Sequence, residues 1–366
     1  MAGSDLISTL SPADLIPWLD RDGGVYLLDV REPDEFADWF IDGAHNIPVG
    51  RLDSRVAEVP SAGRVAVICA SGSRARQAAE ILAVHGVASG VVEGGMRAWA
   101  STYDTVTGDV AGATVVQLRR RGKGCLSYVV GAGASCVVID PSLEVERYVA
   151  IARAHGWTVT HVFDTHLHAD HLSGARALVA ATGAQLWLNP ADPFAFDFEP
   201  LSDGRAVTLA EGVELTVAAV SVPGHTEGST MYRLVDAAIF TGDTVFLESV
   251  GRPDLADQAE AFAHHLYRSL HERVLPLGDD VTVFPAHYGP GVAVRVGEFV
   301  ARPLGELRAT LPALALGEEE FVSWAVAHVK DRPPNYRRIV HINTGRETLG
   351  GDGAELELGP NRCAIA

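Results

Sequence analysis

The sequence predicts an α/β protein of two domains: a small α/β unit followed by two β-layers between helices, an αββα sandwich. With 366 residues the chain is long enough for two ordinary domains, and 47% hydrophobic residues with 21% charged ones are typical of a globular protein. Apolar runs of strand length alternate with amphipathic segments over the first hundred residues. After a short polar stretch, several strands followed by a helix occur twice, which predicts the second, layered domain.

The N-terminal domain is assigned to residues 1–105. Its continuous apolar runs are typical of buried parallel strands, at 24–30 and 64–70. Amphipathic helices are predicted over 32–40 and 73–86, and residues 91–101 predict a strand, a glycine turn and a short helix.

Residues 106–112 are small and polar without a clear period, which predicts a linker. The second domain is assigned to residues 113–366, including a C-terminal extension. Its first strands, at 114–121 and 125–140, include a glycine-rich hairpin turn. Further strands and helices then alternate up to a last clear strand at 281–289.

Charge and terminal sequence exclude several classes of protein. The formal net charge of −18 argues against a nucleic-acid-binding surface, since phosphates require basic patches. The N-terminal residues do not resemble a signal peptide, and no apolar run is long enough to cross a membrane. The four cysteines lack the spacing of a disulfide framework. We therefore expect a cytoplasmic protein that binds neither nucleic acid nor a membrane.

A cluster of metal-ligating side chains follows an apolar strand in the second domain. His166, His168, Asp170 and His171 lie within six positions, between a predicted strand and a predicted helix. Ligands in such a loop are held by rigid elements while the metal stays accessible. This cluster predicts a metal site, but it leaves open the number of ions, the element and the reaction.

Three later segments supply further ligand-type residues. His225 follows a Pro-Gly turn, and Asp243 and His287 each end a predicted strand. Together, the seven residues resemble the signature of the metallo-β-lactamase fold, over residues 113–300. In two-metal members of that family, the residues matching His166, His168 and His225 hold one ion. Those matching Asp170, His171 and His287 hold the other, and the residue matching Asp243 bridges them.

A cysteine in the N-terminal domain lies where a strand meets a helix. The stretch CASGSR places Cys69 at a helix N-terminus, where free N–H groups and the helix dipole stabilise a thiolate, and Arg74 adds positive charge. With DVREPDEF, GAHNIP and VEGGMRAW, residues 5–105 resemble a rhodanese domain. The resemblance makes Cys69 the carrier of a persulfide and Arg74 a catalytic residue, with substrate-binding residues at Ser71, Gly72 and Ser73.

The two resemblances together favour one branch of the metallo-β-lactamase fold, the persulfide dioxygenases, which oxidise glutathione persulfide with O2 to sulfite. The resemblance implies one Fe(II) per chain, held by residues matching His166, His225 and Asp243. This triad leaves coordination positions open for O2 and the persulfide sulfur. Asp170 is assigned a catalytic role, and His168, Asp170, His171 and His287 are expected to support the ligands or to hold a second ion.

The segment VGRPDL (250–255) strengthens this resemblance, because persulfide dioxygenases carry a G-R-x-D stretch here. Arg252 is expected either to bind a carboxylate of the thiol or to brace the ligand loop, paired with Asp254. Tyr288 is a second expected substrate contact. Ser229 departs from the cysteine that some of these enzymes have at the matching position.

Two other interpretations remain open from the sequence. One is a thioester hydrolase of the glyoxalase II type with two Zn²⁺ ions and an accessory rhodanese domain. The other is a sulfur-binding module with an inactive metal site, which the complete ligand set disfavours. The expected partners are a small thiol persulfide, thiosulfate or sulfite, and O2. The thiol is left open among glutathione, coenzyme A and other carriers, and the family resemblance also allows a homo-oligomer.

Overall fold

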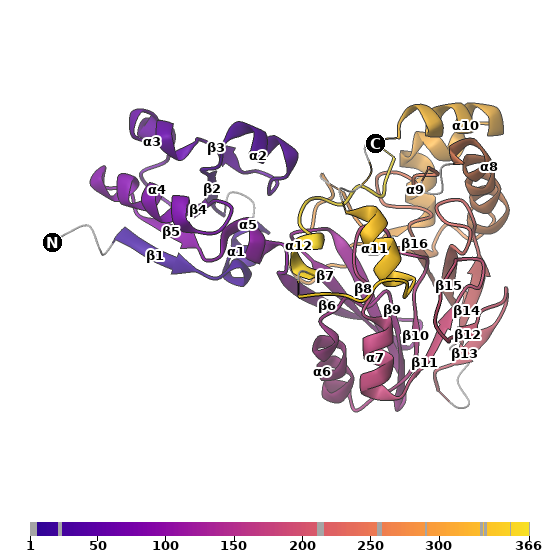
Figure 1. Ribbon diagram of the computed structural model, residues 1–366. Helices are drawn as coiled ribbons and strands as arrows, with labels where there is room; N and C mark the ends of the chain where they lie inside the picture. The colour runs from indigo at the N-terminus through magenta and orange to yellow at the C-terminus, as the bar shows by residue number, and fades with distance from the viewer. Residues whose placement is uncertain are drawn as a thin grey trace.

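A computed structural model describes residues 6–20, 24–210, 216–254, 258–289, 291–329, 332, 335–351 and 353–365. Within these ranges the strands form three sheets, of five, seven and six strands. The first sheet lies in the N-terminal domain and the other two lie in the second domain, next to it (Figure 1). The predicted α/β fold class, with an αββα second domain, is confirmed.

The first sheet is parallel and has the order β1-β5-β4-β2-β3. Its strands are β1 (Ile7–Leu10), β2 (Tyr26–Asp29), β3 (His45–Asn46), β4 (Val65–Ile68) and β5 (Ser89–Val92). The helices around it are α1 (Pro12–Leu19), α2 (Pro33–Asp38), α3 (Val49–Arg55) with a 3-10 turn (Val56–Glu58), α4 (Ser73–Val84) and α5 (Gly95–Trp99). Strand β4 is buried along its whole length and has an apolar cluster on each side, as its continuous apolar sequence predicts.

The linker prediction for residues 106–112 is wrong. Residues Tyr103–Val110 form strand β6, which pairs with β7 (Ala113–Arg120) at the edge of the second sheet, and residues 111–112 form the turn between them. The alternating burial of β6 explains the error, because an edge strand with one solvent-facing side can be small and polar.

The second sheet has the order β12-β11-β10-β9-β8-β7-β6. Its remaining strands are β8 (Cys125–Ala132), β9 (Ser135–Ile139), β10 (Thr158–Phe163), β11 (Gln185–Leu188) and β12 (Glu199–Pro200). Helices α6 (Val145–His155) and α7 (Ala175–Thr182) cover its outer face, and their buried residues share an apolar cluster with that face.

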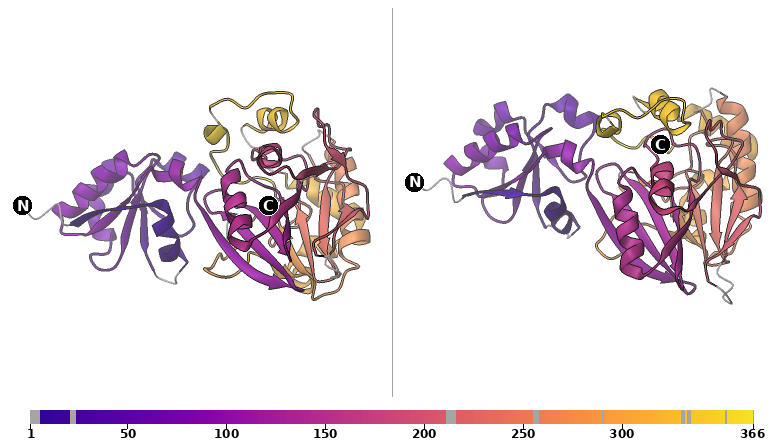
Figure 2. Two further views of the ribbon diagram at one scale, coloured as in Figure 1. Left: turned by 90° about the horizontal axis from the view of Figure 1, so that it is seen from below. Right: turned by 60° about the horizontal axis from the view of Figure 1, so that its bottom comes forward.

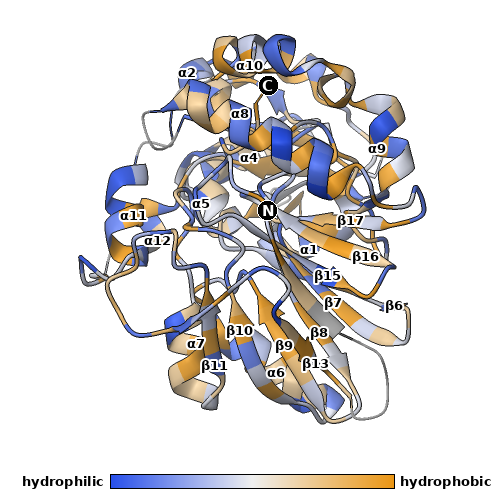
Figure 3. Ribbon diagram, turned by 90° about the vertical axis from the view of Figure 1, so that its right-hand side faces the viewer, coloured by the Kyte–Doolittle hydropathy of each residue, from blue (hydrophilic) through white to orange (hydrophobic). Residues whose placement is uncertain are grey.

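The third sheet has the order β13-β14-β15-β16-β17-β18. Its strands are β13 (Ala206–Thr208), β14 (Thr216–Ser221), β15 (Thr230–Leu234), β16 (Ala238–Gly242), β17 (Thr282–Pro285) and β18 (Arg302–Pro303). The helices beside it are α8 (Ala259–Ser269), which continues as a π-helical turn (Leu270–Val274), α9 (Leu304–Thr310), a 3-10 turn (Pro312–Ala315) and α10 (Glu318–Ala327). Figure 3 shows apolar strands between these helices and α6–α7.

The largest apolar cluster fills the space between the second and third sheets. Tyr128 of β8 packs edge-on against Phe240 of β16 and Phe284 of β17, with ring centroids 4.8 and 5.6 Å apart. This shared core fixes the two sheets relative to each other, so the loops at their common edge also have fixed positions.

A C-terminal segment, residues 335–351 and 353–365, contains α11 (Tyr336–Asn343) and α12 (Gly353–Leu356). It lies over the second domain and reaches the junction with the N-terminal domain (Figure 2). At that junction Arg121 forms a buried ion pair with Asp20, and the indole N–H of Trp39 donates to the carbonyl of Gly122 at 3.1 Å. Among the described residues, no helix is both long and apolar enough to span a bilayer.

Candidate metal centre and cysteine loop

The seven predicted metal-site residues all follow strand ends at one edge of the sandwich. His166, His168, Asp170 and His171 lie in the loop after β10, and His225 lies in the loop after β14. Asp243 and His287 directly follow β16 and β17 by one or two residues. All seven side chains are buried, so the fold brings together residues that are up to 121 positions apart in the sequence (287 − 166).

Three of these side chains form one compact triad. The Nε2 atoms of His166 and His225 each lie 3.5 Å from Oδ2 of Asp243. These three atoms are buried, and within the described chain none of them has a hydrogen-bond partner. Unpaired buried polar atoms that converge in this way are costly unless they bind a ligand, so the triad fits a metal ion.

The remaining polar atoms of the triad are oriented by hydrogen bonds. Nδ1 of His225 lies 2.9 Å from the carbonyl oxygen of Arg252. Because a carbonyl oxygen can only accept a hydrogen bond, Nδ1 carries the proton, and the lone pair on Nε2 is available for a metal. Nδ1 of His166 contacts the hydroxyl of Thr165 at 2.9 Å, and Oδ1 of Asp243 contacts Nδ1 of His287 at 2.6 Å.

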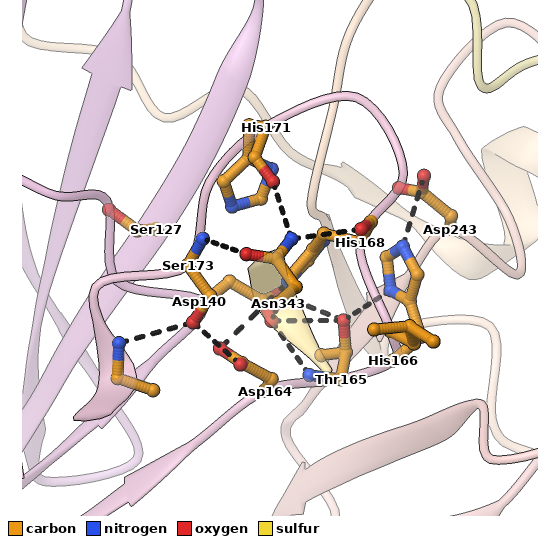
Figure 4. Close-up of polar contacts among 12 residues, drawn as sticks. Ser127, Asp140, Asp164, Thr165, His166, His168, His171, Ser173, Asp243 and Asn343 are labelled. Carbon is orange, nitrogen blue, oxygen red and sulfur yellow. Dashed lines mark hydrogen bonds and ion pairs between the residues drawn. The ribbon is translucent and has the colours of Figure 1, made fainter. Parts of the chain in front are cut away.

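His168 is oriented differently from the triad. Its Nε2 atom lies 3.0 Å from Oδ1 of Asp140, the same carboxylate that accepts from the backbone N–H of Thr165 at 2.7 Å. Figure 4 shows Thr165 between Asp140 and His166, with Asp243 on the far side of His166. His168 is therefore held by a carboxylate that follows β9 and does not point its Nε2 atom at the triad.

A second cluster lies beside the triad and contains an unexpected cysteine. Ligand atoms of Asp170, His171, His287 and Cys125 lie within 4.8 Å of one another, all from buried residues. Cys125 therefore does more than pack within its hairpin strand. An isolated bridge between Cys125 and His287 brings the first residue of β8 to the metal loops. Cys363 of the C-terminal segment is similarly close to Asp243 and His287.

Burial and neighbouring charges set the protonation of these histidines. Burial, followed by the neighbouring His168, lowers the pKa of His166 well below its usual range, and burial also lowers the pKa of His225. Both rings are therefore neutral near pH 7, as metal ligation requires. Burial alone would lower the pKa of His287, but the carboxylates of Asp170 and Asp243 raise it well above its usual range.

A pocket of about 290 Å³ opens next to His225. Its apolar lining includes Leu167, Ala169 and Phe262, and α11 contributes Tyr336 and Arg337. The sequence alone assigns no role to the segment that contains α11. No local sequence signal identifies α11 as a pocket wall, because it reaches the metal loops only through tertiary contacts.

Neither predicted substrate contact near the metal loops faces this pocket. The Arg252 side chain is buried, pairs with Asp254 at 2.7 Å and donates to the carbonyl of Arg362 at 2.9 Å, which fits the bracing role and not contact with substrate. Tyr288 packs against the core, and its ring lies near Arg121 at the domain junction.

Position 251, next to Arg252, requires glycine, since a Cβ there would overlap the carbonyl oxygen of Asp243.

The cysteine loop of the N-terminal domain surrounds a buried sulfur. The backbone N–H groups of Gly72 and Ala75 point at Sγ of Cys69, at 3.1 and 3.4 Å. Gly72 has a φ of +100°, a backbone conformation that glycine adopts without strain and that lets the loop curl around the sulfur. The loop can thus stabilise negative charge on Cys69 or on a sulfur attached to it.

The other predicted residues of this loop differ in exposure. Ser71 and Ser73 are exposed at its rim. Arg74 forms an ion pair with Glu35 of α2, with N–O distances of 2.6 and 2.7 Å, and also interacts electrostatically with Cys69. This hydrogen-bonded pair lowers the pKa of Glu35 to about 2.

Comparison with known proteins agrees with this architecture. Residues 11–102 match the rhodanese-like domain, and residues 120–287 match the metallo-β-lactamase superfamily. The persulfide dioxygenase ETHE1 of Bos taurus, a mitochondrial protein, is 31% identical over 206 residues, which cover 55% of this chain and 76% of that protein. A hydroxyacylglutathione hydrolase of Rhodospirillum rubrum is 38% identical, but the match covers only 33% of this chain and 47% of that relative.

A solved structure supports the same relationship. The crystal structure of ETHE1 from Myxococcus xanthus matches with a TM-score of 0.56 and 28% identity, over 63% of this chain and 98% of that one. The chain therefore belongs to the metallo-β-lactamase superfamily, is related within it to the persulfide dioxygenases, and carries a rhodanese-like domain on the N-terminal side of the metallo-β-lactamase fold.

Proposed function

We propose that the second domain is a persulfide dioxygenase with one iron, and that the rhodanese-like domain transfers sulfane sulfur through Cys69. The observation that carries this proposal is the triad of His166, His225 and Asp243, with three unpaired buried ligand atoms and His168 bonded to Asp140. A 2-His-1-carboxylate set is typical of non-haem Fe(II) oxygenases, and Zn²⁺ has no redox chemistry.

The net reaction converts a thiol persulfide, O2 and water into the thiol and sulfite. The sulfane sulfur loses four electrons, and O2 takes up all four. When bound, Fe(II) supplies the redox chemistry that this oxidation requires.

The residues of this chain bind the substrate, orient it and exclude water from it. The thiol part of the substrate occupies the pocket beside His225, where Leu167, Ala169 and Phe262 offer apolar contacts. Arg337 at its edge provides a positive charge for a carboxylate of the carrier. Asp170 lies 3.1 Å from Nε2 of His287, and this pair is placed to hold a proton next to the triad.

In the rhodanese-like domain, the Cys69 thiolate attacks the sulfane sulfur of a donor such as thiosulfate. The S–S bond of the donor breaks, sulfite leaves, and Cys69 carries the sulfur as a persulfide. The N–H groups of Gly72 and Ala75 stabilise the charge on this sulfur.

The alternative is hydrolysis of a thioester at two zinc ions. The observation in its favour is the second cluster of Asp170, His171 and His287, whose facing atoms lie close together but make no well-aligned hydrogen bond within the described chain. The related hydroxyacylglutathione hydrolase adds support, although it matches over less than half its length.

Oxygen uptake separates these two reactions. Protein purified without air and loaded with Fe(II) should consume O2 and release sulfite when glutathione persulfide is added. Cleavage of a glutathione thioester without any persulfide-dependent O2 uptake would favour the hydrolase and overturn the proposal.

A further inference from the structure

The loop that carries His168, Asp170 and His171 is fixed by a side chain from the C-terminal segment. The amide nitrogen of Asn343, at the end of α11, donates to the carbonyl oxygens of His168 and His171 at 2.9 and 2.8 Å. Its amide oxygen accepts from the N–H of Ser173 at 3.0 Å. Figure 4 shows Asn343 between these three residues. One buried amide thus satisfies three backbone groups of a loop that lies outside any helix or strand.

A carboxylate one helix further along supports the same loop. Oε1 of Glu357, just after α12, accepts from the N–H of Leu172 at 2.7 Å. Its other oxygen lies 3.0 Å from Nη1 of Arg120, and the two side chains are only 6% and 4% exposed. Nε of Arg120 donates to the carbonyl of Ala100, the residue that follows α5 of the rhodanese-like domain, at 2.6 Å.

These contacts form a continuous path from the rhodanese-like domain to Asp243, a triad residue of the second domain. From Ala100 the path runs through Arg120 and Glu357 to the amide of Leu172, the residue that follows His171. Within the loop, Asp170 lies 3.1 Å from His287, which in turn contacts Asp243 of the triad at 2.6 Å. A movement of the loop can therefore change the position of the Asp243 carboxylate through only two side chains, those of Asp170 and His287.

We propose that Asn343 and Glu357 are positioning residues of the metal centre, and that the Arg120–Glu357 ion pair makes the geometry of the metal loop depend on the docked rhodanese-like domain. This inference rests on the metal triad of the proposed function. Neither residue faces the triad itself, so both act through the loop backbone. Loss of a partner hydrogen-bonded directly to a ligand typically weakens metal affinity about 10–100-fold, and we expect the same range here because the loop positions Asp170 against His287.

Metal affinity of the full chain tests the inference, with Fe(II) or Co(II) alone as the probe. Glu357→Gln keeps an oxygen for Leu172 but loses the charge that pairs with Arg120, and Asn343→Ala removes all three of its hydrogen bonds. Glu355→Gln is the matched control, because Glu355 is exposed and its 3.6 Å contact with Arg97 is a surface ion pair. We expect the first two variants to bind metal about 10–100-fold more weakly, and the control to bind as the parent does.

The single variant Glu357→Gln leaves the buried charge of Arg120 without its carboxylate partner and can unfold the protein. The double variant Arg120→Gln/Glu357→Gln avoids this, since it removes both charges of the pair. It should remain folded and still bind metal weakly, and its Co(II) absorption spectrum should change. Sulfur transfer from thiosulfate to cyanide serves as the folding readout for the rhodanese-like domain. Parent-like affinity and spectra in Asn343→Ala and in the double variant would overturn the inference. Because the readout is metal binding, a failure of persulfide oxidation overturns the proposed function and leaves this test valid.

Discussion

Nε2 of His168 lies 3.0 Å from Oδ1 of Asp140, whereas Nε2 of the neighbouring His166 lies 3.5 Å from Oδ2 of Asp243. The two histidines of the H-x-H motif thus have different partners, although they are two residues apart. Nδ1 of His168 is buried and has no hydrogen-bond partner in the described chain, so a variant of His168 is needed to separate a site with three ligands for one ion from a site in which both histidines bind it.

The first prediction uses this difference. His225→Ala removes a triad ligand and should abolish iron binding. His168→Gln removes a residue bonded to Asp140 and should leave the iron stoichiometry unchanged, with affinity lowered by about 10–100-fold. Metal analysis after loading with excess Fe(II) measures both. Equal loss of stoichiometry in the two variants would show that His168 is itself a ligand.

The second prediction concerns the division of work between the domains. Cys69→Ser should abolish sulfur transfer, because a hydroxyl does not carry a sulfane sulfur, and should leave persulfide-dependent O2 uptake unchanged. His225→Ala is the reciprocal control and should lose O2 uptake while retaining sulfur transfer. The two rates are measured on the same preparations. If each variant lost both activities, the two sites would not be independent.

The third prediction concerns the ion pair at the cysteine loop. Glu35→Gln removes the partner of Arg74 and should lower KM for thiosulfate by about 3–10-fold, because the freed guanidinium attracts the dianion near Cys69. Glu58→Gln is the control, since it breaks a similar exposed pair with Arg55 in the same domain. An unchanged KM in Glu35→Gln would remove Arg74 from substrate binding.

The pH dependence of this effect follows from the pKa of Glu35, which its hydrogen bond with Arg74 lowers to about 2. A lowered pKa means that the pair contributes stability above the ordinary glutamate value and loses it as the pH falls toward 2. The difference in KM between parent and Glu35→Gln should therefore be constant from roughly pH 5 to pH 8. A difference that disappears within that range would contradict the assigned ionisation.

The sequence places the three triad residues at one site because each of them follows a predicted strand of the sandwich. Such strands are placed by the core between the two sheets, so the residues after them meet at one edge. The cysteine loop is predictable for a similar reason, since strand, glycine and helix are adjacent in the sequence. Both sites are thus encoded by local patterns.

The residues around the metal centre are not encoded in this way. Cys125 reaches it through an isolated bridge with His287, and Asn343 and Glu357 contact loop residues that are 170 to 185 positions away in the sequence. Such contacts depend on the tertiary arrangement, and the polar residues that make them resemble ordinary surface residues. The edge strand β6 differs from the predicted linker for a related reason, because small polar residues are compatible with a strand that has one exposed face.

Reconstitution with defined metals tests the central claim most directly. The protein is stripped with a chelator and then titrated with Fe(II) or with Zn²⁺, while O2 uptake on glutathione persulfide and cleavage of a glutathione thioester are both followed. We predict that persulfide oxidation rises linearly with Fe(II), saturates at a single equivalent per chain, and is absent with Zn²⁺. Thioester cleavage that saturates at two equivalents of Zn²⁺, with no oxidation at any Fe(II) concentration, would contradict the claim.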